Sequence, residues 1–425
     1  MLPETPPETL AETIAAPLNE RRWLSIVGIG EDGVEGLGEN ARKAITEAAI
    51  VFGGKRHLEL AARLISGEAR PWPVPFDAAM RDVVAQRGRN VCVLASGDPF
   101  FFGVGATLSH HVESDEFKAY PAPSAFSLAA SRLGWPMQEI ETVSLHGRSI
   151  DLIRPLLHPG RRVIALTSDD KAPAEIAALL AATGFGASRL TVLEALGGEA
   201  ERIRSTTASE FALPAINVLN VLAIEVSAER GARILPRGFG LDDTLFEHDG
   251  QITKREIRAL TLSALAPRRG ELLIDIGAGS GSIAIEWLLA DPSMRAIAVE
   301  AHPERAARIR RNAATFGVPG LTLVEGTAPQ ALQGLPLADA VFIGGGGSEP
   351  GVFDAAVAVL KPGGRLVANA VTLEMEAVLL TAQAQLGGNL IRIDIARAAP
   401  IGAMQGWKPA MPVTQWIWTK QEQDT

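Results

Sequence analysis

The chain has 425 residues, of which 47% are hydrophobic, so it is long enough to fold into two or three domains that each bury a core. Its formal net charge of −9 at pH 7 argues against a broad nucleic-acid surface, because phosphate binding draws on clustered Lys and Arg. With one cysteine, Cys92, the chain can build neither a disulfide framework nor a thiolate metal cluster, and we expect this thiol to be buried in a core.

The N-terminal segment carries acids and prolines where a secretory signal would carry a basic segment and an apolar core. Residues 1–21 are therefore predicted to be a disordered leader. No run of about 18 uninterrupted apolar residues follows, as a membrane-spanning helix would need. We expect a cytoplasmic protein that acts on neither membranes nor nucleic acid.

Residues 22–230 show strands that alternate with helices. "WLSIVGIG" reads as a buried strand that ends in glycines, and "RNVCVLASGDP" reads as a second strand with a loop at its carboxyl end. "RRVIALTSD" is a further strand, followed by the helix "APAEIAALLAATGFGA". This alternation is typical of an α/β domain in which helices cover a sheet. Residues 231–248 contain glycines, prolines and charges without a period, and are predicted to be a linker.

The pattern restarts in residues 249–420. "TKREIRALTLSALA" predicts a helix with Ile257, Leu260 and Leu265 on its apolar face. Strands are predicted at "ELLIDIG", "RAIAVEAH", "LTLVEG", "DAVFIGG" and "GGRLVANAV", with helical segments between them. This order predicts a Rossmann-like, doubly wound α/β fold, in which ligands bind beyond the carboxyl ends of the strands.

A knot of glycines follows the first of these strands. Gly277, Gly279 and Gly281 permit positive φ angles and bring backbone N–H groups against a ligand at the N-terminus of the next helix. The spacing is G-x-G-x-G rather than the G-x-G-x-x-G of nicotinamide enzymes. Glu300 ends the second strand, where a carboxylate can accept hydrogen bonds from both hydroxyls of a ribose. The spacing favours S-adenosylmethionine over NAD, and an NAD(P)-dependent oxidoreductase remains the alternative.

Several motifs of this half occur in the same order as the motifs of a known family. With "DIGAGSGS", "VEGTAP" and "DAVFIGGGG", residues 250–420 resemble the class I S-adenosylmethionine-dependent methyltransferases. Within that class, "TKREIRA", "FIGG" and "GGRLVANAVTLE" resemble the precorrin C15-methylating, decarboxylating enzymes. The resemblance implies that the cofactor is held by Thr253, Gly277, Ala278, Gly279, Ser280, Gly281, Glu300 and Ala328. The methionine end would lie on the glycines, the ribose on Glu300 and the adenine beside Ala328, with Thr253 closing the site. Thr253 and Glu256 also fit a capping box of the helix, and both roles can hold together.

The first half resembles a different family. "VGIG", "ASGDPFFFG" and "YPAPSAFSLAASRLG" follow in the order found in the tetrapyrrole methylases, which are class III methyltransferases. The resemblance implies a fold of two α/β lobes with a cofactor between them, held near Ser96, Gly97, Asp98, Phe101, Ser124 and Ala125. Two loops depart from the family pattern, because "GEDG" replaces G-P-G-D and "PAPS" replaces P-G-[IV]-S. A second alternative is therefore that one half is a non-catalytic scaffold.

One family on each half, joined in this order, resembles the fused enzymes that methylate a corrin precursor in vitamin B12 biosynthesis. The resemblance implies a tetrapyrrole substrate and S-adenosyl-L-methionine at two sites. It also implies methylation of carbon 15, with decarboxylation of an acetate side chain, in the second half and of carbon 5 in the first. We further expect a homo-oligomer.

Methyl transfer from a sulfonium needs alignment and a dry pocket rather than a protein nucleophile, so no catalytic residue and no metal site is assigned. The carboxylates of such a substrate need local cations. The candidates are Lys254, Arg255 and Arg258 beside the second site, and Arg56 and His57 in the first half. The alternative for each is a solvated charged surface.

Overall fold

The computed structural model describes residues 22–73 and 79–421, so the predicted leader, residues 1–21, lies outside the described residues. The chain divides into two compact units. The first unit comprises Met1–Arg148 and Pro159–Ala232, and the second comprises Ser149–His158 and Arg233–Thr425.

The first unit contains a parallel sheet with the strand order β3-β2-β4-β1-β5. Its strands are β1 (Leu24–Ile29), β2 (Ile50–Gly53), β3 (Glu68–Pro71), β4 (Val91–Ser96) and β5 (Phe117–Tyr120). Its helices are α1 (Glu39–Thr46) and α2 (Lys55–Ala61) on one face, and α3 (Ala79–Val84) and α4 (Val104–Leu108) on the other. The central strands β1 and β4 are buried on both faces, which is why their sequences are nearly continuous apolar runs. Cys92 is fully buried in this core, as expected from the sequence.

A second, mixed sheet completes the first unit, with the order β6-β7-β10-β8-β9. Its strands are β6 (Ile140–Ser144), β7 (Arg162–Leu166), β8 (Arg189–Glu194), β9 (Arg202–Thr207) and β10 (Asn220–Glu225). The helices of this part are α5 (Ala125–Leu133) and α6 (Ala172–Ala182). Helix α5 packs Phe126 and Ala129 against Leu193 and Val221 of the sheet. The first unit therefore has the two α/β lobes that the resemblance implies.

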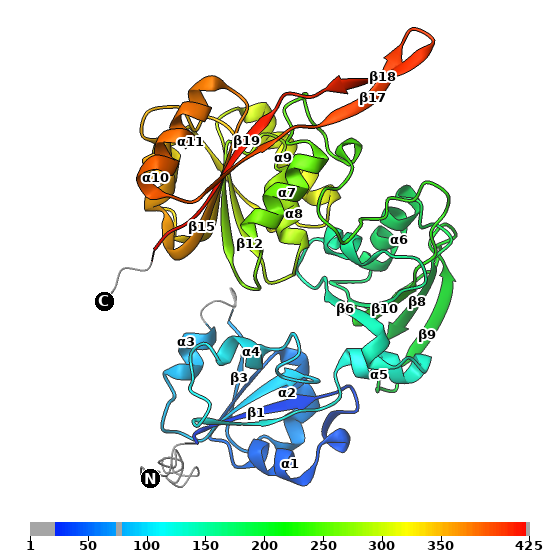
Figure 1. The fold of residues 1–425 in the computed structure, drawn as a ribbon. Coiled ribbons are helices and arrows are strands. Elements are labelled where there is room, and N and C mark those ends of the chain that lie inside the picture. The colour runs from blue at the N-terminus through cyan, green and yellow to red at the C-terminus, as the bar shows by residue number, and fades with distance from the viewer. Residues whose placement is uncertain (1–21, 74–78, 422–425) are drawn as a thin grey trace, which may run out of the picture. The chain divides into compact units, whose positions relative to one another are not determined.

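The second unit is built on a seven-stranded sheet with the order β13-β12-β11-β14-β15-β19-β16. Five strands are parallel, namely β11 (Leu272–Ile276), β12 (Arg295–Glu300), β13 (Thr322–Glu325), β14 (Ala338–Ile343) and β15 (Leu360–Ala370). Two are antiparallel to their neighbours, namely β16 (Asn389–Ile393) and β19 (Val413–Thr419). Helices α7 (Arg255–Leu265), α8 (Ser282–Leu289) and α9 (Pro303–Thr315) pack on one face, and α10 (Val352–Ala358) and α11 (Leu373–Leu386) on the other (Figure 1). The second unit is therefore a Rossmann-like α/β fold, as predicted.

Two details of the second unit differ from a simple reading of its sequence. Leu260 is 44% exposed, because α7 turns Leu262 and Leu265 toward the sheet instead, while Ile257 is buried as predicted. Residues 231–248, which the sequence predicts to be a linker, contribute to a core. Leu235, Leu241 and Phe246 of this segment are buried with Ile285 and Phe316. The segment therefore contributes its own side chains to the core of the second unit.

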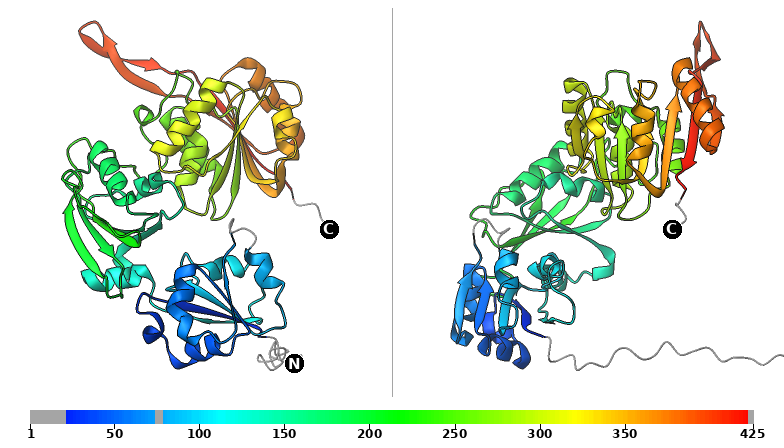
Figure 2. Two further views of the ribbon diagram at one scale, coloured as in Figure 1. Left: turned by 180° about the vertical axis from the view of Figure 1, so that it is seen from behind. Right: turned by 90° about the vertical axis from the view of Figure 1, so that its left-hand side faces the viewer.

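A two-stranded hairpin, β17 (Ala396–Ile401) and β18 (Met404–Pro409), extends the β16–β19 pair away from the rest of the second unit (Figures 1 and 2). Ile401, Met404 and Trp407 are exposed on it. Among the described helices, none is long and apolar enough to cross a membrane.

Candidate active sites

The glycine knot of the second unit forms a tight loop between β11 and α8. Gly277, Gly279 and Gly281 have φ angles of +70°, +61° and +76°, which non-glycine residues rarely adopt. A Cβ at Gly277 would lie 2.6 Å from the carbonyl oxygen of Gly345, and a Cβ at Gly281 would lie 3.1 Å from Cγ2 of Ile309. A Cβ at Gly279 would have one protein atom within 4 Å, the carbonyl oxygen of Gln251 at 3.4 Å. Gly277 and Gly281 therefore serve the packing of the protein, whereas Gly279 leaves space for a ligand.

The backbone amides of this loop are already bonded within the protein. The amides of Gly277 and Ala278 both donate to the carbonyl oxygen of Val299, at 3.0 and 3.1 Å, and the amide of Gly279 donates to Oε2 of Glu300 at 2.8 Å. The prediction that the loop turns its amides toward a ligand is therefore wrong for these three residues. A dinucleotide pyrophosphate depends on free amides at a helix N-terminus, and these three amides are not available to one.

Two buried acids lie behind the loop. Glu300 is 4% exposed, and its Oε1 accepts from the amide of His302 at 3.0 Å. Because each carboxylate oxygen has a further lone pair, Glu300 can still accept from ribose hydroxyls. Asp275 accepts from the amide of Ala284 at 3.2 Å, while its other oxygen has no partner. Burial raises the pKa of Asp275 to about 7 against the effect of that hydrogen bond, and the charge of Glu300 adds to the rise. Asp275 therefore titrates near neutral pH, directly behind the glycine loop.

Thr253 lies directly before α7, but it does not cap this helix. The N-cap is Lys254, which makes no side-chain capping bond, and the carboxylate of Glu256 pairs with Arg397. The predicted capping box is therefore wrong. Thr253 does follow Gln251, whose carbonyl oxygen is the atom that approaches Gly279. The structure thus brings the segment that contains Thr253 up to the glycine loop.

Ala328 lies in the loop after the neighbouring strand β13. Glu325 at the end of β13 pairs in register with Glu300, and the amide of Gly326 donates to the carbonyl oxygen of Glu300 at 3.0 Å. Ala328 is partly buried against the core of the sheet. It therefore lies at the same edge of the sheet as Glu300 and the glycines.

In the first unit, the loops after β4 and β5 meet at the carboxyl edge of the parallel sheet. The carbonyl oxygen of Gly97 accepts from the amide of Ala122 at 3.3 Å, and a Cβ at Gly28 would lie 1.8 Å from that same oxygen. A Cβ at Gly97, whose φ is +57°, would lie 3.0 Å from Cα of Ser124. Ser124 caps α5 by accepting from the amide of Ser127 at 3.1 Å. Ser96, Gly97, Ser124 and Ala125 are therefore brought together.

Asp98 and the phenylalanines that follow form the exposed part of this first candidate site. Oδ1 of Asp98 accepts from the amide of Phe100 at 2.9 Å, which closes a turn. Phe101 lies with its ring centroid 5.0 Å from that of Phe126 in α5, and Phe102 lies 5.6 Å from the same ring. Phe102 has a φ of +58°, a strained conformation for an aromatic residue. The turn made by Asp98 therefore presents aromatic rings beside α5.

The structure excludes two of the predicted cations, Arg258 and His57, as binding partners for substrate carboxylates. Arg258 is fully buried, and it bonds Glu286 at 2.5 Å and Asp243 at 3.0 Å, so it is a structural cation. Burial lowers the pKa of His57 to about 4, and the charge of Arg56 adds to that effect, so His57 is neutral at pH 7. Arg56 itself pairs with Glu31.

Lys254 and Arg255 are about half exposed and lie 3.9 and 3.7 Å from Asp243 and Asp242, respectively. Both therefore stay candidates for binding substrate carboxylates.

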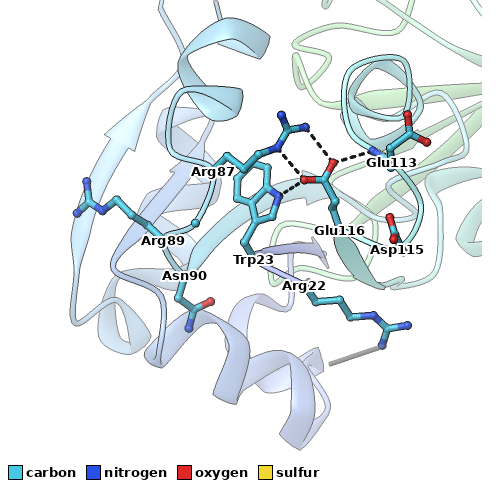
Figure 3. Close-up of a pocket in the computed structure, with 9 residues that line it drawn as sticks. Arg22, Trp23, Arg87, Arg89, Asn90, Glu113, Asp115 and Glu116 are labelled. Carbon is cyan, nitrogen blue, oxygen red and sulfur yellow. Dashed lines mark hydrogen bonds and ion pairs between the residues drawn. The ribbon is translucent and has the colours of Figure 1, made fainter. Parts of the chain in front are cut away.

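A surface hollow of the first unit lies elsewhere, around Trp23 (Figure 3). Nε1 of Trp23 donates to Glu116 at 2.9 Å, and Nε of Arg87 lies 2.7 Å from the same carboxylate. Trp23 directly precedes β1, so the hollow is at the amino edge of the sheet, opposite the Asp98 loop. It therefore lies away from the edge at which ligands of open α/β sheets bind, and we do not assign it as a candidate active site.

Sequence reasoning missed one buried polar residue of the second site. Asn312 of α9 is 1% exposed, and its Nδ2 donates to the carbonyl oxygen of Ser280 in the glycine loop at 2.9 Å. The sequence pattern that could have indicated it is the spacing from Ile309, because a residue three positions further along a helix lies on the same, buried face.

Comparison with known proteins finds a family on each half of the chain. Residues 24–212 match the family described as Tetrapyrrole (Corrin/Porphyrin) Methylases, and residues 244–420 match the family described as Precorrin methyltransferase domain. The chain is 66% identical over 398 residues, 94% of this chain and 96% of the relative, to a precorrin-6Y C(5,15)-methyltransferase [decarboxylating] of Sinorhizobium sp.

Two relatives from Salmonella typhimurium each match a part of the chain. One is a cobalt-precorrin-6B C(15)-methyltransferase (decarboxylating), 36% identical over 166 residues, 38% of this chain and 85% of the relative. The other is a cobalt-precorrin-7 C(5)-methyltransferase, 31% identical over 201 residues, 46% of this chain and 98% of the relative.

Proposed function

The chain belongs to the family of precorrin-6Y C(5,15)-methyltransferases (decarboxylating), and we propose that its two units each bind one S-adenosyl-L-methionine and each perform one of the two methylations. As a member of this family it is a methyltransferase of cobalamin biosynthesis that methylates and decarboxylates a tetrapyrrole precursor. Precorrin methyltransferases use S-adenosyl-L-methionine.

One observation carries the proposal of two sites. Each unit has its own sheet with parallel strands, and each sheet has a glycine-bearing loop at its carboxyl edge, at Gly97 in the first unit and at Gly279 in the second. Ligands of open α/β sheets bind at that edge. Because the two loops lie in separate units with separate cores, the two sites would work independently.

In the second unit the residues present fit the cofactor. When bound, S-adenosyl-L-methionine supplies an electrophilic methyl group on a cationic sulfur. Glu300 would accept from the ribose hydroxyls, and the open face of Gly279 would admit the methionine end. Lys254 and Arg255 would bind carboxylates of the substrate through charge-assisted hydrogen bonds. In the first unit, the Asp98 turn and the N-cap Ser124 would hold the cofactor.

The partial relatives support a division of labour between the units. The 201-residue match to the C(5)-methyltransferase is longer than the segment 244–420, which favours its placement on the first unit. The decarboxylating C(15)-methyltransferase then corresponds to the second unit. The first unit would thus methylate carbon 5, and the second would methylate carbon 15 and remove carbon dioxide from an acetate side chain.

Glu300→Ala tests the second site. We expect it to weaken cofactor binding there by about 1.5–3 kcal/mol, the scale of hydrogen bonds to a charged group. Titration calorimetry on the full chain measures this as a loss of affinity at one of two sites. Glu325→Ala is the matched control: Glu325 ends the neighbouring strand, but it is exposed and pairs with Arg310 on the surface, so its loss should leave both affinities unchanged. Equal affinities in Glu300→Ala and the wild type would contradict the assignment.

The exposed hairpin supports a proposal on assembly. Ile401, Met404 and Trp407 are 63%, 75% and 76% exposed on β17 and β18, and an isolated two-stranded hairpin is marginally stable in water. We propose that a second copy of the chain covers these side chains in a homo-oligomer. Light scattering should give a mass above the 44.9 kDa of one chain, and the mass of a single chain would contradict the proposal.

A further inference from the structure

A short segment of the second unit passes directly over the glycine loop. We call residues 247–253 the strap. At its middle, the carbonyl oxygen of Gln251 lies 3.4 Å from the position of a Cβ on Gly279, the one glycine of the knot that faces open space. The strap therefore forms part of the wall of the space in which the cofactor is proposed to lie.

Both ends of the strap are held by buried side chains. At its start, Oδ1 of Asn312 accepts from the amide of Glu247 at 2.9 Å, and Nδ2 of Asn312 donates to the carbonyl oxygen of the same residue at 3.0 Å. At its end, the carbonyl oxygen of Thr253 accepts from Arg258 at 2.5 Å. Arg258 is also bonded to Glu286, so its position is fixed by the core.

Asn312 joins the strap to the glycine loop. Its Nδ2 group has two hydrogens, one for Glu247 and one for the carbonyl oxygen of Ser280 at 2.9 Å. Its side-chain amide thus makes three hydrogen bonds while it is 1% exposed, where each unsatisfied partner would carry the full cost of desolvation. One buried amide therefore fixes the distance between the two walls of the site.

Ile252 of the strap packs against the buried cluster of Leu235, Leu241 and Phe246, and the acids of the strap form ion pairs nearer the surface. Asp249 pairs with Arg305 at 2.9 Å and with Arg308 at 3.1 Å, and Glu247 pairs with Arg311 at 2.8 Å. Hydrogen bonds from Arg305, from the backbone and from Arg308 hold the pKa of Asp249 well below its usual range, so this acid is ionised at neutral pH. The amide of Asn312 and the guanidinium of Arg258 are buried side chains that hold the strap, and Asn312 also binds the glycine loop.

The geometry points to Asn312 as a positioning residue of the second site, which sets the strap against the glycine loop and so sets the affinity for the adenosyl cofactor. This rests on the proposed function of the second unit. Asn312 does not touch the reacting atoms. It acts through the backbone of Glu247 and Ser280, and its effect should therefore fall on the Michaelis constant for the cofactor rather than on turnover at saturation.

Asn312→Ala in the full chain tests this role. We expect the Michaelis constant for S-adenosyl-L-methionine in the decarboxylating reaction to rise roughly tenfold, because the three hydrogen bonds that hold the strap against the glycine loop are lost, with turnover at saturating cofactor nearly unchanged. Methylation by the first unit should not change. Arg311→Ala is the matched control, because it removes the surface ion pair to the same Glu247 and should alter the constant by less than about twofold.

Hydrogen exchange adds a readout that general destabilisation would not give. Asn312→Ala should speed exchange in residues 247–253 and leave the strands of the sheet as slow as in the wild type. Asn312→Ser, which keeps a hydroxyl that can donate and accept, serves if the alanine variant does not fold. In the wild type, added cofactor should slow exchange in the strap, and this measurement needs no variant.

Three results separate the possible outcomes. A wild-type chain that neither binds cofactor in the second unit nor releases carbon dioxide overturns the proposed function itself. A wild type that does both, with an unchanged Michaelis constant in folded Asn312→Ala, overturns only the role of Asn312. Exchange in the strap that does not respond to cofactor in the wild type also overturns that role.

Discussion

Gly279→Trp is expected to abolish the release of carbon dioxide and the methylation that accompanies it. The indole would occupy the open face of Gly279, where the only nearby protein atom is the carbonyl oxygen of Gln251 at 3.4 Å, and would thus fill the space proposed for the cofactor. The positive φ of this residue adds strain of about 1–2 kcal/mol for any L side chain. Mass spectrometry should find a product that keeps its acetate carboxylate and has gained at most one methyl group.

A matched variant controls for strain and bulk in this experiment. Gly270 also has a positive φ, +80°, with no atom near its Cβ position, but it precedes β11 and so lies at the opposite edge of the sheet. Gly270→Trp should therefore keep decarboxylation. Circular dichroism must show that both variants are folded. Full decarboxylation by a folded Gly279→Trp chain would show that the glycine loop is not the second site.

Asp98→Ala is expected to remove the other methylation and leave decarboxylation intact. Without Oδ1 of Asp98, the amide of Phe100 loses its acceptor, and the turn that orders the loop after Gly97 is lost. The product should be decarboxylated and lighter than the full product by the mass of one CH2 group. Asp98→Asn keeps an oxygen at the same position, so it should retain most of the methylation if the turn rather than the charge matters.

These two variants also test whether the sites are independent. Each should lose one methylation and keep the other, because the two loops belong to separate units with separate cores. If either folded variant loses both methylations, the units are coupled, and the proposed division of labour is wrong.

The sequence predicts the buried parallel strands well, for a physical reason. Strands such as Val91–Ser96 and Leu272–Ile276 are buried on both faces, so they appear as apolar runs that end at glycines. The antiparallel end of the second sheet was not predicted. β16 and the hairpin of β17 and β18 are largely exposed, so neither shows the alternation that marks a half-buried strand.

The sequence also predicts the edge of the sheet at which the second site lies, but not the bonding within it. Glu300 was found because acids at strand ends face the ligand edge, and the structure places it against the glycine loop. The amides of Gly277 and Ala278 donate to the carbonyl oxygen of Val299. This bonding depends on how two strands and a loop pair in space, which the sequence does not show. The burial of Arg258 likewise depends on Glu286, which lies 28 residues along the chain.

The number of cofactors bound per chain tests the central claim most directly. Titration calorimetry of the full wild-type chain with S-adenosyl-L-methionine should give two sites per chain, and Gly279→Trp should retain one. A single site per chain in the wild type would contradict the proposal that both units bind cofactor, and would make one unit a scaffold for the other.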